Sequence, residues 1–131
     1  MSLQSDGLKL ELSAGMSVTI YGIRNCDTMK KAFQWLESNG VDYTFHDYRV
    51  DGIDADTVRR WCDASGWEKV LNKGSRTFRA LPDATRADIN EGSAINLMTS
   101  EPTMIKRPVL NASGVIEVGF KPDRYAELFA R

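Results

Sequence analysis

The sequence contains two thiols, Cys26 and Cys62, in different surroundings. Cys26 stands between a β-rich run that ends at Gly22 and a helical pattern that begins at about Asp27. A thiol at a helix start faces N–H groups that lack partners within the helix, and the positive end of the helix dipole. Both favour the thiolate, which is the nucleophilic form. A free cysteine is often only a small core residue, but this loop-to-helix position favours a reactive role for Cys26.

Cys62 lies within a second helical pattern, on the same apolar face as Val58 and Trp61. That setting predicts a buried and inert thiol. The two cysteines do not form a C-x-x-C pair, because Met29 occupies the second cysteine position after Cys26. Redox chemistry here therefore starts from one thiol and needs a second thiol from another molecule.

Several cations lie near the predicted nucleophile in sequence or precede a later strand. Arg24 and Lys30 flank Cys26, and Asp27 opposes their effect on the thiol. Arg107 precedes Pro108, a residue tolerated at the start of a strand, where a cis peptide bond is one option. From the residues alone, Arg107 is either an anion-binding group or a solvated surface charge.

The remaining polar groups suggest no further chemistry. His46 lies on a predicted strand without a second base or ligand beside it, so we expect it to be a satisfied sheet residue. The basic residues Lys73, Arg76 and Arg79 either grip an anion or form a solvated face, and such runs are usually solvated. Two thiols and one histidine are too few for a structural zinc site.

Length and composition fit one domain of ordinary globular type. The 131 residues are 42% hydrophobic and 27% charged, with a formal net charge of −1. That charge argues against a general nucleic-acid binder, and no apolar run approaches the ~20 residues of a membrane span. Two thiols make no secreted disulfide framework, so we expect a cytoplasmic protein. We interpret residues 1–15 as a tag or mobile extension and residues 16–131 as the domain.

The elements that position Cys26 begin with a βαβ unit. The run Val18–Gly22 predicts a buried strand, residues 26–39 repeat apolar side chains at helical spacing, and residues 41–48 return to a period of two. A strand, a helix and a strand joined by short loops predict two parallel strands with a right-handed crossover.

Helices then dominate up to Pro102. Asp54 is a good N-cap for a helix over 55–65 that ends at Gly66, after a turn at Asp51 and Gly52. We predict a short helix over 67–71, a basic loop over 72–79, and a helix over 84–99 that weakens or breaks at Gly92.

The chain ends with a hairpin and a helix. Strands over 108–110 and 115–118 flank a predicted turn over 111–114, and a last helix opens at Lys121. The order βαβ, helices, ββα predicts an α/β, thioredoxin-like fold: a mixed four-stranded sheet with helices on both faces and an inserted helical segment.

These features together resemble the arsenate-reductase-like ArsC/Spx family, with the nearest similarity to its YffB-like branch. The resemblance extends over 16–131 and depends on four ordered segments: Tyr21–Ala32, His46–Gly52, Ile105–Val109 and Gly119–Pro122. It implies a thioredoxin-like sheet with a helical insertion and a nucleophilic cysteine at the position of Cys26.

The resemblance also implies an anion site. Three arginines cradle the oxyanion in the family's arsenate reductases; here Arg107 keeps one, whereas Asn72 and Lys121 replace the others. Asparagine is uncharged and lysine lacks the planar fork of arginine, so we expect weak arsenate reduction. Spx-type regulators often carry a C-x-x-C switch, which Met29 removes.

The YffB-like branch implies a thiol reductase that uses glutathione. We therefore predict a glutathione-dependent thiol/disulfide oxidoreductase with Cys26 as its nucleophile and no bound cofactor or metal. Arg107 and Lys121, with Arg24 or Lys30, would meet the carboxylates of glutathione, and the peptide segment before Pro108 would pair with its backbone. The alternatives are an arsenate reductase and a non-catalytic redox-sensing or partner-binding protein of the Spx type. We expect a monomer that binds neither nucleic acid nor membranes.

Overall fold

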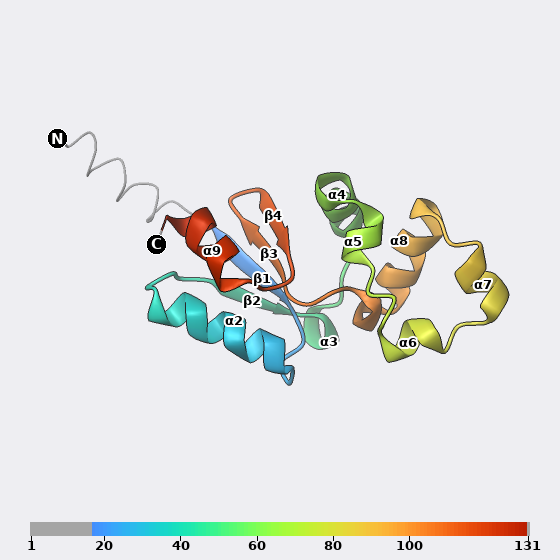
Figure 1. Cartoon of the computed structure of the whole chain (residues 1–131), viewed down its shortest axis with the longest axis horizontal. Coiled ribbons are helices and arrows are strands. Elements are labelled where there is room, and N and C mark those ends of the chain that lie inside the picture. The colour runs from blue at the N-terminus through green and yellow to red at the C-terminus, as the bar shows by residue number, and fades with distance from the viewer. Residues whose placement is uncertain (1–16, 131) are drawn as a thin grey trace.

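A computed structural model describes residues 17–130 and contains one four-stranded mixed sheet (Figure 1). Its strands are β1 (Val18–Gly22), β2 (Thr44–Asp47), β3 (Val109–Ala112) and β4 (Val115–Val118), in the order β2-β1-β3-β4. β1 and β2 are parallel, and β3 is antiparallel to both β1 and β4. This confirms the predicted topology. The extension that we predicted over residues 1–15 lies outside the described residues.

One face of the sheet is covered by α2 (Asp27–Ser38) and α9 (Pro122–Phe129). The helix α2 is the predicted crossover, and it ends before Gly40, whose φ of 69° lies in the left-handed region. The buried side chains between these helices and the sheet are Val18, Ile20, Met29, Ala32, Leu36, Val41, Leu110, Ala112, Tyr125 and Phe129. They form the first of two core clusters.

The inserted segment forms a helical lobe against the other face and beyond one end of the sheet (Figure 1). It contains α4 (Ala55–Ser65), α5 (Trp67–Val70), α6 (Arg76–Arg79), α7 (Asp83–Ala87), α8 (Glu91–Ser100) and the 3₁₀ turn η1 (Pro102–Met104). The second core cluster joins Trp61 of α4 and Met98 of α8 to Val109 and Val118 of the sheet. The lobe and the sheet therefore share one core. No helix among residues 17–130 has the length and hydropathy that crossing a membrane requires.

The strand predicted over 41–48 is shorter than its pattern indicated. Only Thr44–Asp47 pair with β1, and Tyr48–Asp51 form a one-turn helix, α3, where we predicted strand and turn. The side chain of Asp47 accepts a hydrogen bond from the backbone N–H of Arg49 at 2.9 Å, which caps this turn. A single turn is too short to show helical periodicity in the sequence.

Two boundaries within the lobe also differ from the prediction. Residues 76–79 of the predicted basic loop form α6, because the Ser75 hydroxyl accepts a hydrogen bond from the N–H of Phe78. The helix predicted over 84–99 is broken at 88–90, whereas Gly92 lies inside α8. The break falls there because Asn90 caps α8.

The hairpin turn is tighter than predicted. Asn111 and Ala112 belong to β3, so only Ser113 and Gly114 connect the strands. Both residues have positive φ, 50° and 95°, as a type I′ turn requires.

Candidate active site

Cys26 is the N-cap residue of α2 and is partly exposed to solvent. Burial alone would raise the pKa of its thiol. That effect is outweighed by the backbone N–H of Met29, by the guanidinium of Arg107 and by the backbone N–H of Thr28, so the pKa of Cys26 lies below its ordinary value. The side chain of Cys26 accepts no capping hydrogen bond from the helix. A neutral thiol is a weak acceptor, and its interactions with N–H groups strengthen once it ionises. Partial exposure and a lowered pKa are the conditions under which a cysteine thiol reacts as a nucleophile.

Arg107 is the cation that lowers the pKa of Cys26. It is half-buried, and its Nη1 donates to the carbonyl of Thr103 at 3.2 Å. The next peptide bond, Arg107–Pro108, is cis, and Pro108 is buried. Arg107 is therefore not a fully solvated surface charge, and its guanidinium stabilises the Cys26 thiolate.

Tyr48 is a neighbour of Arg107 that the sequence analysis missed. Burial raises the pKa of its phenol, which therefore stays neutral, and the charge of Arg107 acts on it in the opposite direction. Within residues 17–130, the Tyr48 hydroxyl and the Nε of Arg107 are both buried without a hydrogen-bond partner. No sequence signal pointed to this pair, because Tyr48 ends a predicted strand and Arg107 lies far along the chain.

A pocket of about 490 Å³ adjoins Arg107. It is lined by Ile23, Arg49, Asn72, Gly74, Ser75, Arg76, Thr77, Thr103 and Arg107. Two of the residues that we predicted for the anion site, Asn72 and Arg107, thus line one pocket, together with Arg49 and Arg76, which we had not assigned to the site. The side-chain oxygen of Asn72 accepts a hydrogen bond from the N–H of Gly74 at 3.0 Å, so its amide nitrogen is the group left to donate.

The other predicted site residues are not in this pocket. The guanidinium of Arg24 lies 5.2 Å from the centre of the Phe45 ring, and Lys30 is exposed on α2. Lys121 is the N-cap residue of α9 and lines a different pocket, of about 590 Å³, together with Lys69 and Arg124. Arg107 and Asn72 therefore line one cavity, whereas these three cations and Cys26 itself are not among its lining residues.

Cys62 differs from Cys26 in every respect that matters for reactivity. It is 3% exposed within the second core cluster. Burial raises the pKa of Cys62 to about 11, with smaller contributions from the carboxylates of Glu91 and Asp63. This confirms the predicted buried setting of this thiol.

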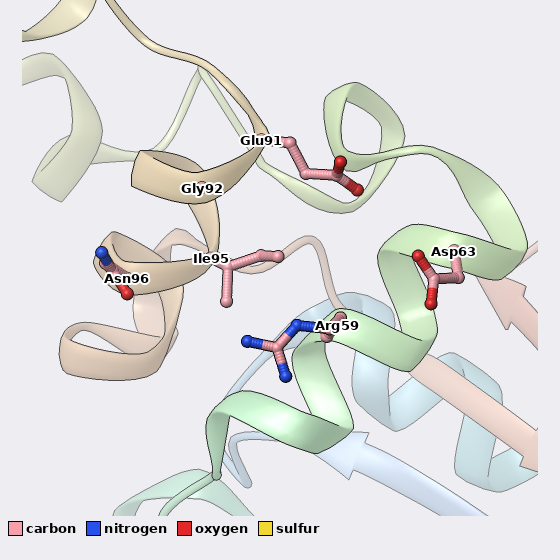
Figure 2. Close-up of a pocket in the computed structure, with 6 residues that line it drawn as sticks. All are labelled: Arg59, Asp63, Glu91, Gly92, Ile95 and Asn96. Carbon is pink, nitrogen blue, oxygen red and sulfur yellow. The ribbon is translucent and has the colours of Figure 1, made fainter.

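Glu91 and Asp63 also line a pocket between α4 and α8 (Figure 2). Its volume is about 340 Å³, and its lining comprises Arg59, Asp63, Glu91, Gly92, Ile95 and Asn96. Arg59 already forms an ion pair with Asp56 at 2.8 Å. Neither Cys26 nor Arg107 lines this pocket, so it has no connection to the nucleophile.

His46 has a structural role. Its Nε2 lies 2.6 Å from the carbonyl oxygen of Gly52, which makes that nitrogen the donor and ties β2 to the loop after α3. This confirms a satisfied sheet residue. Among residues 17–130, no group of three or more His, Cys, Asp and Glu side chains is arranged to hold a metal ion.

Comparison with known proteins identifies relatives over almost the whole described chain. The ArsC family model matches residues 21–128. A solved structure of a YffB protein is 53% identical, with a TM-score of 0.82, and the match covers 85% of this chain and 97% of the other. An arsenate reductase (ArsC) related protein from Brucella melitensis is 52% identical, with a TM-score of 0.69, and the match covers 88% and 96% of the two chains.

Curated relatives are more distant. An uncharacterized protein of Haemophilus influenzae is 37% identical over 113 residues, which cover 86% of this chain and 99% of the relative. The global transcriptional regulator Spx of Lactiplantibacillus plantarum is 23% identical over 119 residues, which cover 87% of each chain. The region matched by the ArsC family model includes both Cys26 and Arg107.

Proposed function

Because this chain belongs to the ArsC family, we propose that it is a glutathione-dependent thiol/disulfide oxidoreductase whose single nucleophile is Cys26. The observation that supports this best is the setting of the thiol. Cys26 is partly exposed, it caps a helix, and the N–H groups of that helix and Arg107 lower its pKa despite burial. Exposure and a stabilised thiolate together are what disulfide exchange requires.

The proposed reaction has two exchange steps. The Cys26 thiolate attacks one sulfur of a disulfide substrate; a new S–S bond forms, and the other sulfur leaves with the electron pair and takes a proton from solvent. A glutathione thiolate then attacks the mixed disulfide and releases Cys26. The substrate is reduced and glutathione is oxidised, so no bound cofactor or metal is needed, and glutathione is a co-substrate.

Glutathione suits the surroundings of the thiol. It has two carboxylates, and Arg107, whose charge acts on the Cys26 thiol, lines a cavity together with Asn72. Arginine binds carboxylates through two parallel hydrogen bonds, which fixes the orientation of a ligand as well as holding it.

Arsenate reduction is the second candidate, favoured by the 52% identity to an arsenate reductase related protein. The same Cys26 thiolate would attack arsenic. Against it, Asn72 supplies no charge to the pocket, and Lys121 lines another cavity. Of the three arginines that line the pocket, only Arg107 acts on the Cys26 thiol. One arginine at the sulfur binds a multiply charged oxyanion more weakly than three arginines around the sulfur would.

A non-catalytic role of the Spx type is the third candidate, from the similarity to Spx. The residue three positions after Cys26 argues against a thiol switch within this chain. Met29 is completely buried, and its sulfur lies over Gly22. A partner-binding role without such a switch would leave Cys26 unreactive toward glutathione.

We place this activity in the cytoplasm and assign it to a monomer without nucleic-acid or membrane partners. Both cysteines are free thiols, which a reducing compartment maintains. The net charge of −1 gives little attraction to anionic surfaces.

Incubation with oxidised glutathione tests the proposal. Intact mass should show one glutathione adduct, peptide mapping should place it on Cys26, and reduced glutathione should remove it. Cys26→Ser should abolish the adduct, and Cys62→Ala should leave it unchanged. An unmodified wild-type chain, or an adduct on Cys62, would overturn the assignment and favour the partner-binding role.

A further inference from the structure

The pocket beside Arg107 contains an unusual concentration of positive charge. Arg49 of α3, Arg76 of α6 and Arg107 before β3 all line it, and no acidic residue does. Three cations around one cavity repel one another, and this repulsion is relieved when an anion enters. Asp47 is near in sequence, but its carboxylate accepts from the backbone N–H of Arg49.

These arginines differ from those elsewhere on the surface. Every ion pair within residues 17–130 uses Arg59, Arg86 or Arg124. The guanidinium groups of Arg49 and Arg76 are in no such pair in that part of the chain. Both side chains are exposed and line the cavity, and no carboxylate pairs with them in residues 17–130. Their charge therefore remains available to a ligand.

The rest of the lining provides hydrogen-bonding groups rather than carboxylates. Ser75, Thr77 and Thr103 contribute hydroxyl groups, with Thr77 and Thr103 joined at 3.1 Å, and Asn72 contributes its amide. The volume of about 490 Å³ lies in the range of ~300–1,000 Å³ that small organic ligands occupy. A lone tetrahedral oxyanion would fill only a fraction of it.

We propose that Arg49 and Arg76 are specificity-determining residues that bind a carboxylate of the disulfide substrate. Arg107 stabilises the Cys26 thiolate that attacks the disulfide. The inference rests on the proposed function, since it requires Cys26 to be the nucleophile. Arg107 connects the two parts, because its charge stabilises the Cys26 thiolate and it lines the pocket. The preferred substrates are small disulfides with carboxylates at a distance from the sulfur. Arg49 and Arg76 act on the bound ligand and not on Cys26.

Rates of mixed-disulfide formation on the full chain test this role. Two probes are compared: oxidised glutathione, which has carboxylates, and 2-hydroxyethyl disulfide, which has none. Arg49→Gln and Arg76→Gln should each lower the second-order rate constant with oxidised glutathione by roughly two- to fivefold, and the double variant by about tenfold, as expected for exposed charge pairs. The rate with 2-hydroxyethyl disulfide and the pH profile of Cys26 alkylation should not change.

Arg79→Gln is the matched control, because Arg79 is an exposed cation on the same helix as Arg76 but does not line the pocket. Arg76→Lys, which keeps the charge, should recover part of the loss. If Cys26 reacts with neither disulfide, the proposed function fails. Cys26 can instead react with both disulfides while the double variant keeps the wild-type rate constants, or while both rate constants fall by the same factor. In either case the proposed function stands and the role of Arg49 and Arg76 is wrong.

Discussion

The reactivity of Cys26 depends on a competition between burial and local donors. Burial opposes ionisation, and the N–H of Met29 together with Arg107 reverses that effect. Cys62 has no such donors, and its pKa is about 11. One chain therefore holds two thiols whose pKa values are shifted in opposite directions by their positions, one at a helix start and the other within a core-facing helix.

Alkylation by iodoacetamide, followed for each cysteine as a function of pH, should separate them. Because the pKa of Cys26 is lowered, its alkylation should reach half its maximal rate at a pH below that of a denatured control. Cys62 should remain unmodified in the folded chain. Faster alkylation of Cys62, or a Cys26 profile that matches the denatured control, would contradict the assignment.

The same shift has a consequence for stability. A thiol whose pKa is lower in the folded than in the unfolded chain stabilises the fold once it is ionised. For Cys26 this contribution is fully present above the unfolded pKa and is lost as the pH falls through the folded pKa. The difference in urea midpoint between wild type and Cys26→Ser should therefore shift in favour of wild type as the pH rises through that window. A pH-independent difference would contradict it.

Arg107→Ala tests the contribution of the guanidinium. It removes the positive charge that stabilises the thiolate, so the pKa of Cys26 should rise and glutathionylation near neutral pH should slow several-fold. Arg59→Ala is the control, because Arg59 pairs with Asp56 on α4 and does not contact the thiol. An unchanged alkylation profile in Arg107→Ala would show that the helix N–H groups act alone.

At the scale of the elements, one-turn helices account for two of the differences between the predicted and the observed elements. The helix α3 has four residues and α6 has four. A segment of that length covers a single turn, so no apolar residue repeats at helical spacing. Their caps, Asp47 and Ser75, are visible in the sequence but equally typical of turns. The longer helices α2 and α4 were predictable because several turns repeat the same apolar face.

The start of α8 was missed for a related reason. Asn90 and Ser93 exchange two hydrogen bonds of 3.0 Å, from each backbone N–H to the other's side chain. The usual signal for such a box is Ser or Thr followed three residues later by Glu or Gln. Asparagine followed three residues later by serine does not match that pattern. We therefore predicted the break at Gly92, a residue with low helix propensity, which in fact lies inside α8.

Asn90→Ala should therefore lower the free energy of unfolding by about 1 kcal/mol, as expected for loss of an N-cap. Urea denaturation measures the change. Asn96→Ala is the matched control on the same helix: Asn96 is exposed in the middle of α8, where alanine is favourable, so this variant should be neutral or slightly stabilised. Equal stabilities of Asn90→Ala and wild type would show that the box contributes nothing.

Over the whole molecule, the sequence predicted the order of elements, and the order was enough to define the sheet. Apolar periodicity and turn residues are local, and the parallel and antiparallel pairings follow from connection lengths. The pocket could not be predicted in this way. Arg49, Arg76 and Arg107 come from segments far apart in the chain, and they meet only because the helical lobe packs against the end of the sheet.

This convergence bears on arsenate, the alternative substrate. Asn72 lines the same pocket as Arg107, whereas Lys121 lines another. We expect purified wild-type protein to reduce arsenate poorly with glutathione, because Arg107 is, within residues 17–130, the cation that lowers the pKa of the Cys26 thiol. Asn72→Arg should strengthen arsenate-dependent turnover, since it adds a forked cation to the pocket. Lys121→Arg, the matched control, should change turnover little. Turnover is measured as arsenite formed per enzyme. Robust arsenate reduction by the wild type would make the oxyanion, rather than a disulfide, the better substrate for Cys26.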